Sequence, residues 1–257
     1  MTDTPVIVER LDRVAVVRLS QPQRMNALDL PMREAMGAAF TSLSADAGCL
    51  AIVVTGTDKV FAAGADLRLL VDKSPLGVRA LGFPELWRPI AECPKPVIAA
   101  VAGPALGAGC ELALMCDIIV ADRTAQFGQP ECRVGIMPGA GGTQRLHRVL
   151  GKPMASFLLM TGTTLEAERA FQLGLVCELV DAGAVLTAAL ALAEKIARLP
   201  PLAMEAIKRT LATAADLPLP AAMALDNREF LLLFDSMDQK EGMAAFLEKR
   251  RPNFEGR

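Results

Sequence analysis

Histidine, tryptophan and tyrosine are the scarcest residue types in this 257-residue sequence, which contains one, one and none of them. The six cysteines are scattered, with no Cys-x-x-Cys pair, so the sequence offers no common zinc-ligand spacing and we predict no metal site. We expect the cysteines to be buried free thiols. The single histidine, His147, lies in the basic stretch 144–148, which favours a solvated or packed role over a Ser-His-Asp or Cys-His centre.

The sequence also lacks an excess of one charge and any long apolar run. Its 27 basic and 29 acidic residues give a formal charge of −2, with one short charged cluster at 248–251, so nothing indicates a nucleic-acid partner. The longest uncharged run, 96–110, contains glycine and proline and is too short to span a membrane. Because residues 1–5 show no basic segment followed by an apolar one, we expect no secretion signal and a cytoplasmic protein.

Hydrophobic residues make up 52% of the sequence, and their spacing predicts an α/β body followed by a helical tail. A hairpin of strands is expected within residues 5–20. Asp29 is then predicted to cap a helix that has Pro31 in its first turn and ends near residue 44. Further strands are expected at 50–55, 97–101, 117–121 and 176–180, and tail helices at 182–199, 201–214, 220–234 and 239–249.

Two segments between these elements have weaker patterns. Residues 68–92 are expected to be an irregular helical segment, which Trp87 packs onto the body. Thr163 and Glu166 are predicted to form a capping box for a helix that ends at Gly174.

The stretch 95–117 is the most informative part of the sequence. The apolar run 97–101 predicts a buried strand, and a loop of glycine, alanine and proline leads from it to a helix expected to begin near Gly109. The small side chains of this loop would let a ligand approach the backbone closely. The free N–H groups of the loop and the helix N-terminus would then face the same ligand. Glu111 lies in the first turn of that helix. The helix dipole alone also favours an acid there, so its role is open at this stage.

A second carboxylate, Glu131, and a second small-residue loop at Gly64-Ala65 extend this pattern. If the two loops converge, two backbone N–H groups point at one carbonyl oxygen and form an oxyanion hole. Two carboxylates beside it could share a water and exchange protons with the water and with a carbon atom. A purely structural use of the glycines explains the spacing equally well.

Four segments, taken in order, closely resemble the enoyl-CoA hydratase (crotonase) family. They are residues 61–67, 105–113, 127–131 and 138–145, and the ending 241–250 is similar as well. The resemblance covers nearly the whole chain. It implies an α/β fold with a crotonase-like spiral of ββα units at 1–197, which holds the active site, and a helical trimerisation region at 198–257. It also implies a homotrimer or a homohexamer made of two trimers.

The resemblance implies an enoyl-CoA hydratase, a hydro-lyase that adds water across the α,β double bond of a 2-enoyl-CoA thioester. The N–H groups of Ala65 and Ala108 would bind the thioester oxygen, Glu111 would activate the water and Glu131 would supply the proton to the α carbon. No cofactor is implied, since coenzyme A is part of the substrate. Many relatives have glycine where this chain has Ala108, so we expect a narrower pocket, and a positive φ there would cost about 1 kcal/mol.

Further residues match positions that bind the acyl-CoA substrate in the family. For Lys249, a solvated helix end is an equally good interpretation. The matching residues are Arg24, Ala27, Leu28, Ala63, Asp66, Leu67, Gly139, Phe230, Phe246 and Lys249.

Two other functions stay open. An isomerase of the same fold needs only one carboxylate at the reacting carbons, so the presence of both Glu111 and Glu131 favours hydration. A noncatalytic acyl-CoA-binding or RNA-binding relative is disfavoured by the near-neutral charge and the lack of a basic stripe. The family implies fatty acid metabolism such as β-oxidation, whereas residues 105–114 and 250–257 look like dehydroadipyl-CoA hydratases of aromatic-acid breakdown, so the pathway and the acyl end group are undecided.

Overall fold

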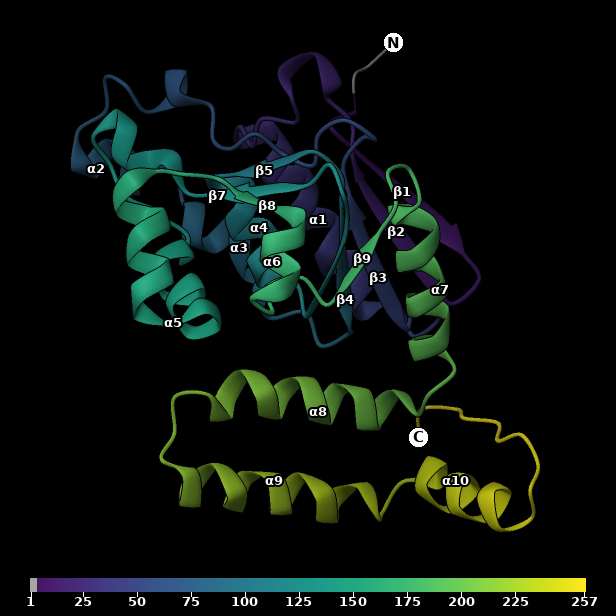
Figure 1. The fold of residues 1–257 in the computed structure, drawn as a ribbon. Coiled ribbons are helices and arrows are strands. Elements are labelled where there is room, and N and C mark those ends of the chain that lie inside the picture. The colour runs from purple at the N-terminus through teal and green to yellow at the C-terminus, as the bar shows by residue number, and fades with distance from the viewer. Residues whose placement is uncertain (1–3) are drawn as a thin grey trace.

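A sheet of six strands runs through the body of the protein in the computed structural model, which describes residues 4–257 (Figure 1). Its order is β1-β2-β3-β4-β6-β9, with β1 antiparallel to β2 and all other neighbours parallel. The antiparallel pair confirms the predicted hairpin. The strands are β1 (Val6–Leu11), β2 (Val14–Leu19), β3 (Ala51–Thr55), β4 (Val97–Val101), β6 (Ile118–Asp122) and β9 (Glu178–Val180).

Strand β4 is apolar along its whole length because both of its faces are covered. Val97, Ala99 and Val101 point into a core shared with α1 (Leu30–Ala45), α3 (Phe83–Ala91) and α4 (Ala108–Met115). Ile98 and Ala100 point into a second core covered by α7 (Val185–Ala197). The central strand is thus held rigidly on both sides, and the loop that follows it has a fixed starting point.

A second, three-stranded sheet consists of β5 (Pro104–Leu106), β7 (Gln126–Gly128) and β8 (Leu165–Glu166). Strand β5 links β4 to α4, and β7 links β6 to α5 (Gly142–Thr161), so the chain repeats a ββα unit as the predicted spiral requires. The sequence prediction placed a loop at 104–106, which is wrong. The strand forms there because these three residues pair in register with β7, a long-range contact that local propensity does not encode.

Several local predictions can be compared directly with the structure. Asp29 caps α1 by accepting a hydrogen bond from the backbone N–H of Met32 at 3.0 Å, as predicted. The capping box is wrong, since Thr163 lies before β8, and the helix α6 begins after Glu166, whose side chain makes no cap. The remaining short elements of the body are η1 (Pro22–Arg24), η2 (Leu67–Leu69), α2 (Pro75–Arg79), η3 (Pro130–Val134) and α6 (Ala167–Gln172).

The cysteine prediction holds only in part. Cys49, Cys93 and Cys110 are buried free thiols and Cys116 is half-buried, whereas Cys132 and Cys177 are exposed. Cys132 lies in the short helix η3, and Cys177 directly precedes β9, the edge strand of the main sheet. Both residues are exposed at these positions.

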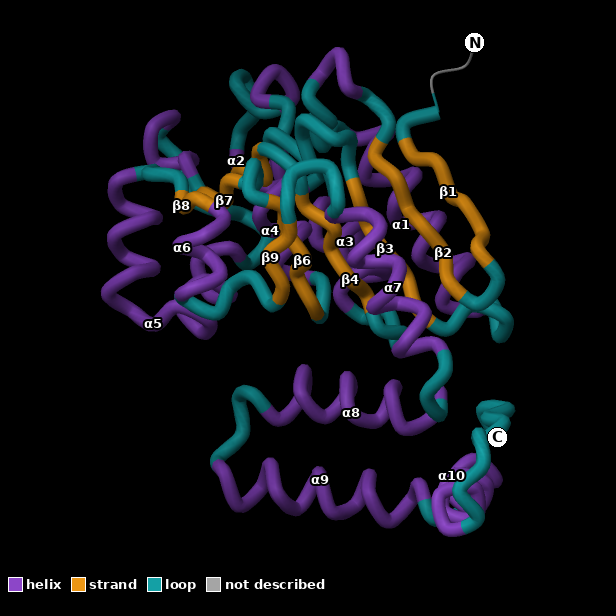
Figure 2. Tube along the Cα trace, turned by 45° about the vertical axis from the view of Figure 1, so that its right-hand side comes forward, coloured by secondary structure: helices purple, strands orange, loops and turns teal. Residues whose placement is uncertain are grey.

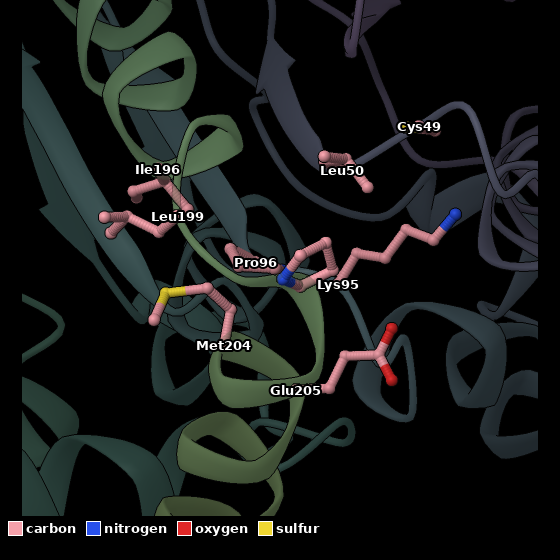
Figure 3. Close-up of a pocket in the computed structure, with 9 residues that line it drawn as sticks. Cys49, Leu50, Lys95, Pro96, Ile196, Leu199, Met204 and Glu205 are labelled. Carbon is pink, nitrogen blue, oxygen red and sulfur yellow. The ribbon is translucent and has the colours of Figure 1, made fainter. Parts of the chain in front are cut away.

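The tail helices α8 (Pro201–Ala214), α9 (Leu219–Leu233) and α10 (Met237–Leu247) form a separate layer beneath the body (Figures 1 and 2). At the joint, Lys208 donates from Nζ to the carboxylate of Asp117 at 2.7 Å and to the backbone oxygen of Lys95 at 2.8 Å. Figure 3 shows the adjoining hollow of about 10 Å³, which has room for about one water and lies away from the predicted site residues. No helix within residues 4–257 is long and apolar enough to cross a membrane.

Candidate active site

The two small-residue loops meet in the structure. The backbone N–H of Leu106 donates to the oxygen of Ala62 at 3.0 Å, and Ala62 pairs with Ala105 as an isolated parallel bridge. A Cβ added at Gly109 would lie 2.1 Å from the Ala62 oxygen, so only glycine permits this approach. The convergence that the spacing left open is therefore present.

Ala65 and Ala108 each carry a backbone N–H that donates to no acceptor within residues 4–257. The two loops that carry these N–H groups lie close together. Gly64 directly precedes Ala65, and a Cβ added at Gly64 would lie 3.9 Å from the Ala108 nitrogen. The N–H of Ala108 is unpaired because this residue is the first in α4. Gly107 has the positive φ of 52°, whereas Ala108 is the first residue of the helix. Ala108 therefore does not carry the backbone strain that a positive φ would cause at an alanine.

Glu111 is held in a fixed position in the first turn of α4. Its side chain is 2% exposed, and its Oε1 accepts hydrogen bonds from the backbone N–H groups of Ala140 and Gly142 at 2.7 and 2.8 Å. Burial lowers the pKa of Arg33 to about 10 and also lowers that of Arg145, while the charge of Glu111 opposes both changes. The Glu111 carboxylate thus lies near two guanidinium groups and is oriented by the glycine-rich turn before α5.

Glu131 lies beside the same loop, at the start of η3. A Cβ added at Gly107 would lie 3.0 Å from Oε1 of Glu131, which places this carboxylate next to the residue that precedes Ala108. The buried amide of Gln129, oriented with its nitrogen towards Glu131, donates to Oε1 and Oε2 at 3.0 and 3.2 Å.

Gln129 also connects the two carboxylates in space. A Cβ added at Gly142 would lie 2.4 Å from the Gln129 amide and 3.0 Å from Cγ of Glu111, so the three groups pack against one another. Glu111 and Glu131 therefore flank one amide side chain and belong to one site. Burial raises the pKa of the Glu131 carboxyl to about 7, and the charge of Glu111 raises it further while a backbone hydrogen bond opposes the rise.

The stretch 24–28, which holds the predicted substrate-binding residues Arg24, Ala27 and Leu28 and resembles the family's coenzyme A wall, is tied to the Ala63–Ala65 loop. The N–H of Ala63 donates to the oxygen of Met25 at 3.0 Å, and the N–H of Leu28 donates to the oxygen of Gly64 at 2.8 Å. The Leu28 side chain is buried in the core, which leaves its backbone and the half-buried Ala27 on the side of the loop.

Arg24 is fixed by two carboxylates, at 2.5 Å from Asp29 and 2.7 Å from Asp66. A side-chain hydrogen bond from Arg68 is the largest cause that lowers the pKa of Asp66 to about 2, and Arg24 adds to it. Leu67 follows on the exposed surface. Arg24, Asp29, Asp66 and Arg68 thus form one charged cluster, in which Asp66 directly follows Ala65 in the chain.

The other predicted binding residues divide into two groups. Gly139 lies in open space next to Ala140, whose N–H holds Glu111, so it belongs to the site. Phe230, Phe246 and Lys249 belong to α9, α10 and the turn after α10, in the layer beneath the body (Figure 2). Within this chain they are not brought together with the carboxylates. Their approach to the pocket of a neighbouring subunit stays a prediction.

Three residues that hold the site together were not assigned a positioning role from the sequence. Gln129 was recognised only as part of a motif, Asn26 only as part of the stretch 24–28 that resembles the family's coenzyme A wall, and Arg33 was given no role. Buried Asn26 donates from Nδ2 to the oxygens of Val60 and Phe61 at 3.2 and 3.0 Å, which ties its loop to the Ala65 loop. Its left-handed φ of 52° is a conformation that asparagine tolerates, and an asparagine after a turn is the one local signal that could have indicated this role.

Comparisons with known proteins cover the chain almost completely. The family model described as Enoyl-CoA hydratase/isomerase matches residues 9–257. The chain is 42% identical over 252 residues to the 2,3-dehydroadipyl-CoA hydratase of Escherichia coli, covering 98% of this chain and 99% of that protein. It is 40% identical over 252 residues to the crotonyl-CoA hydratase of Syntrophomonas wolfei, covering 97% of each. It matches the crystal structure of an enoyl-CoA hydratase from Bacillus anthracis with a TM-score of 0.94 at 32% identity, covering 98% of this chain and 100% of that one.

Proposed function

This chain belongs to the enoyl-CoA hydratase/isomerase family, and we propose that it hydrates 2-enoyl-CoA thioesters to 3-hydroxyacyl-CoA products. The family match and the similarity to a solved enoyl-CoA hydratase confirm the predicted family and its crotonase fold. Two of the relatives are named as hydratases of acyl-CoA thioesters, which supports hydration over isomerisation.

The observation that carries the proposal is the pair of unpaired N–H groups at Ala65 and Ala108 beside Glu111 and Glu131. We infer that these N–H groups form an oxyanion hole. When the thioester oxygen accepts both hydrogen bonds, the negative charge that develops on it during addition to the β carbon is stabilised. One such donor contributes about 3 kcal/mol to lowering the barrier.

The two carboxylates have different proton roles in this proposal. Glu111, whose Oε1 is held by two backbone N–H groups, accepts the proton of the attacking water as hydroxide adds to the β carbon. Glu131, whose raised pKa keeps a large share protonated at neutral pH, gives its proton to the α carbon. The sum of the two transfers is one water added to the double bond. The proton then returns from Glu111 to Glu131 through the next bound water.

Arg24, Ala27, Leu28 and residues 63–67 are proposed to bind coenzyme A, with Gly139 lining the pocket beside Glu111. Arg24 is already oriented by Asp29 and Asp66, so it can meet a polar group of the ligand without losing much side-chain freedom. The proposed chemistry uses only amide N–H groups and two carboxylates, and coenzyme A enters as part of the substrate.

Residues 198–257 are proposed to form a trimerisation region. Their helices expose apolar side chains to an extent that is unusual for a monomer, with Phe246 exposed by 82%. We propose a homotrimer, or two trimers joined as a hexamer, in which Phe230, Phe246 and Lys249 approach a neighbour's coenzyme A pocket. The mass of the protein in solution tests this assembly. The large exposed side chains include Leu211, Leu219, Phe230, Leu232, Phe246 and Leu247.

We also propose that the protein acts in the cytoplasm. All six cysteines carry free thiols, which suits a reducing compartment.

The hydratase proposal is tested with crotonyl-CoA, whose conjugated-thioester absorbance is lost on hydration. Glu131→Gln is expected to lower turnover by at least a hundredfold while coenzyme A binding is retained, because the amide cannot donate a proton to carbon. Unchanged turnover in this variant rejects the assigned role. Faster conversion of a 3-enoyl thioester than hydration of a 2-enoyl one would instead identify an isomerase.

A further inference from the structure

Arg33, on α1, is a buried cation that forms no ion pair within residues 4–257. Its side chain is 3% exposed, and the guanidinium carbon lies 4.2 Å from the ring centre of Phe83 and 4.6 Å from that of Trp87. Burial lowers the pKa of Arg33 to about 10, so the group is still charged at neutral pH. Stacking on aromatic rings partly compensates a buried guanidinium but supplies no hydrogen-bond acceptor.

The hydrogen bonds of this cluster are incomplete. Nε of Arg33 donates to the backbone oxygen of Leu28 at 2.9 Å, whereas neither terminal nitrogen is hydrogen-bonded to any of residues 4–257. Trp87, which is 4% exposed, buries its Nε1 without a partner in the same described region. A buried donor without an acceptor, such as Trp87 Nε1, is costly in a folded protein, so a ligand that supplies acceptor oxygens to it and to the terminal nitrogens of Arg33 would stabilise this cluster.

The two carboxylates whose charges act on Arg33, those of Asp29 and Glu111, already have other partners. Asp29 accepts from the N–H of Met32 and pairs with Arg24, and Glu111 accepts from two backbone N–H groups. Their charges raise the pKa of Arg33 without forming a direct bond to it. The terminal nitrogens of the guanidinium thus keep hydrogen-bonding capacity that no carboxylate within residues 4–257 uses.

The position of the cluster relates it to the reacting part of the substrate. Leu28, which accepts from Arg33, donates its own N–H to Gly64, the residue before Ala65. Glu111 is close enough to affect the charge of Arg33. Arg33 therefore lies between the Ala65 loop, Glu111 and α3, inside the body and enclosed by aromatic rings. A buried place next to the carboxylates suits the acyl chain, whereas the phosphates of coenzyme A need a solvated surface.

We propose that Arg33, with Trp87, recognises a carboxylate at the far end of the acyl chain, so that the preferred substrates are short dicarboxylic 2-enoyl thioesters. This inference rests on the proposed hydratase function and adds the substrate class to it. A planar guanidinium binds a carboxylate through two parallel N–H···O bonds, and the indole N–H supplies a further donor. The name of the 42% identical Escherichia coli relative, a 2,3-dehydroadipyl-CoA hydratase, describes a substrate of this chemical class.

The kinetic test compares two six-carbon substrates that differ only at the end of the chain, hex-2-enoyl-CoA and its 6-carboxylate counterpart, 2,3-dehydroadipyl-CoA. We expect kcat/KM to favour the dicarboxylic substrate by at least tenfold. Arg33→Met is expected to reduce this ratio by at least tenfold, and Arg33→Lys by several-fold because a lysine keeps the charge but loses the paired geometry. Arg88→Met is the matched control, since Arg88 is an exposed arginine next to Trp87 on α3, and it should leave the ratio unchanged.

A binding measurement separates this inference from the hydratase proposal. Trp87 is the only tryptophan of the chain, so its fluorescence reports ligands at Arg33 without any reaction. Saturated adipyl-CoA is expected to bind at least tenfold more tightly than hexanoyl-CoA, and Arg33→Met is expected to abolish the difference. If this preference is found without any hydration, the hydratase proposal fails and the carboxylate site stands.

The opposite results overturn the inference. Equal kcat/KM for the two six-carbon substrates, together with equal binding of their saturated analogues, would show that Arg33 does not recognise the carboxylate at the end of the acyl chain. An Arg33→Met variant that keeps the dicarboxylic preference would contradict it in the same way. Circular dichroism establishes that each variant is folded, and if Arg33→Met does not fold, Arg33→Lys decides the question alone.

Discussion

The amide nitrogen of Gln129 donates to both carboxylate oxygens of Glu131, at 3.0 and 3.2 Å. This contact orients the carboxyl group from the buried side and leaves its other lone pairs towards the Gly107 loop. Gln129 also lies near Glu111, because a Cβ added at Gly142 would meet both side chains, so one uncharged side chain lies beside both carboxylates. Gln129 is therefore a positioning residue for the proposed proton donor.

Replacing Gln129 with leucine should lower kcat/KM by about 10- to 100-fold, since the carboxyl group of Glu131 loses its orientation. An amide donor favours the ionised carboxylate, so its removal should also move the alkaline limit of activity to higher pH. Gln126→Leu is the matched control, because Gln126 likewise donates to a glutamate, Glu166, but on the surface. Equal losses in the two variants, or an unmoved pH limit, would contradict the positioning role.

The pH dependence of hydration should reflect the raised pKa of Glu131. The protonated form, which the reaction needs, is present below the pKa of about 7 and disappears above it. We therefore expect kcat/KM for crotonyl-CoA to fall about tenfold per pH unit well above pH 7. The residual activity of Glu131→Gln should lack this decline. Wild-type activity that stays constant up to pH 9 would exclude Glu131 as the acid.

The approach of the two loops depends on the absence of a side chain at Gly109. Gly109→Ala should destabilise the protein by about 1–3 kcal/mol, because the added Cβ meets the Ala62 oxygen at 2.1 Å and separates the loops. The displaced N–H groups should also lower kcat by about a hundredfold or more. Urea unfolding and crotonyl-CoA kinetics measure the two effects. Gly37→Ala, in the interior of α1 with ordinary contacts, should leave stability unchanged or slightly raised.

Asp66 should contribute to stability in a pH-dependent way. Its folded-state pKa of about 2 lies below its ordinary value of 3.8, so its stabilisation is present above pH 4 and is lost as the pH falls towards 2. After allowance for solvent screening, Asp66→Asn should lower the free energy of unfolding by about 1 kcal/mol at pH 7. Thermal melts of both proteins at pH 7 and at pH 2 test this. A difference in stability that is equally large at pH 2 would contradict it.

Local chemistry predicted much of the fold. The cap at Asp29, the run of buried strands and the helix that begins beside Gly109 follow from side-chain preferences over a few residues, and the structure has them. Strand β5 escaped prediction because its three residues become a strand only by pairing with β7. The predicted capping box at 163–166 is absent because Leu165 and Glu166 pair with β7 as strand β8.

The sequence identified those residues of the candidate site that lie in recognisable motifs. Spacing within the chain identified Glu111 and Glu131 but could not show that Gln129 lies between them, since that depends on how η3 and α5 pack. The sequence did not indicate a role for Arg33 for a similar reason. In the sequence it is one polar residue on an amphipathic helix, and only the packing of α3 against α1 makes it a buried cation beneath Phe83 and Trp87.

The proposed oxyanion hole is tested most directly by a crystal structure of the protein with a saturated thioester such as hexanoyl-CoA, which cannot be hydrated. We expect the thioester oxygen to lie about 3 Å from the backbone nitrogens of both Ala65 and Ala108, and the α and β carbons of the acyl chain to face Glu131 and Glu111. A thioester oxygen bound elsewhere, or an acyl chain that lies away from the two carboxylates, would contradict it.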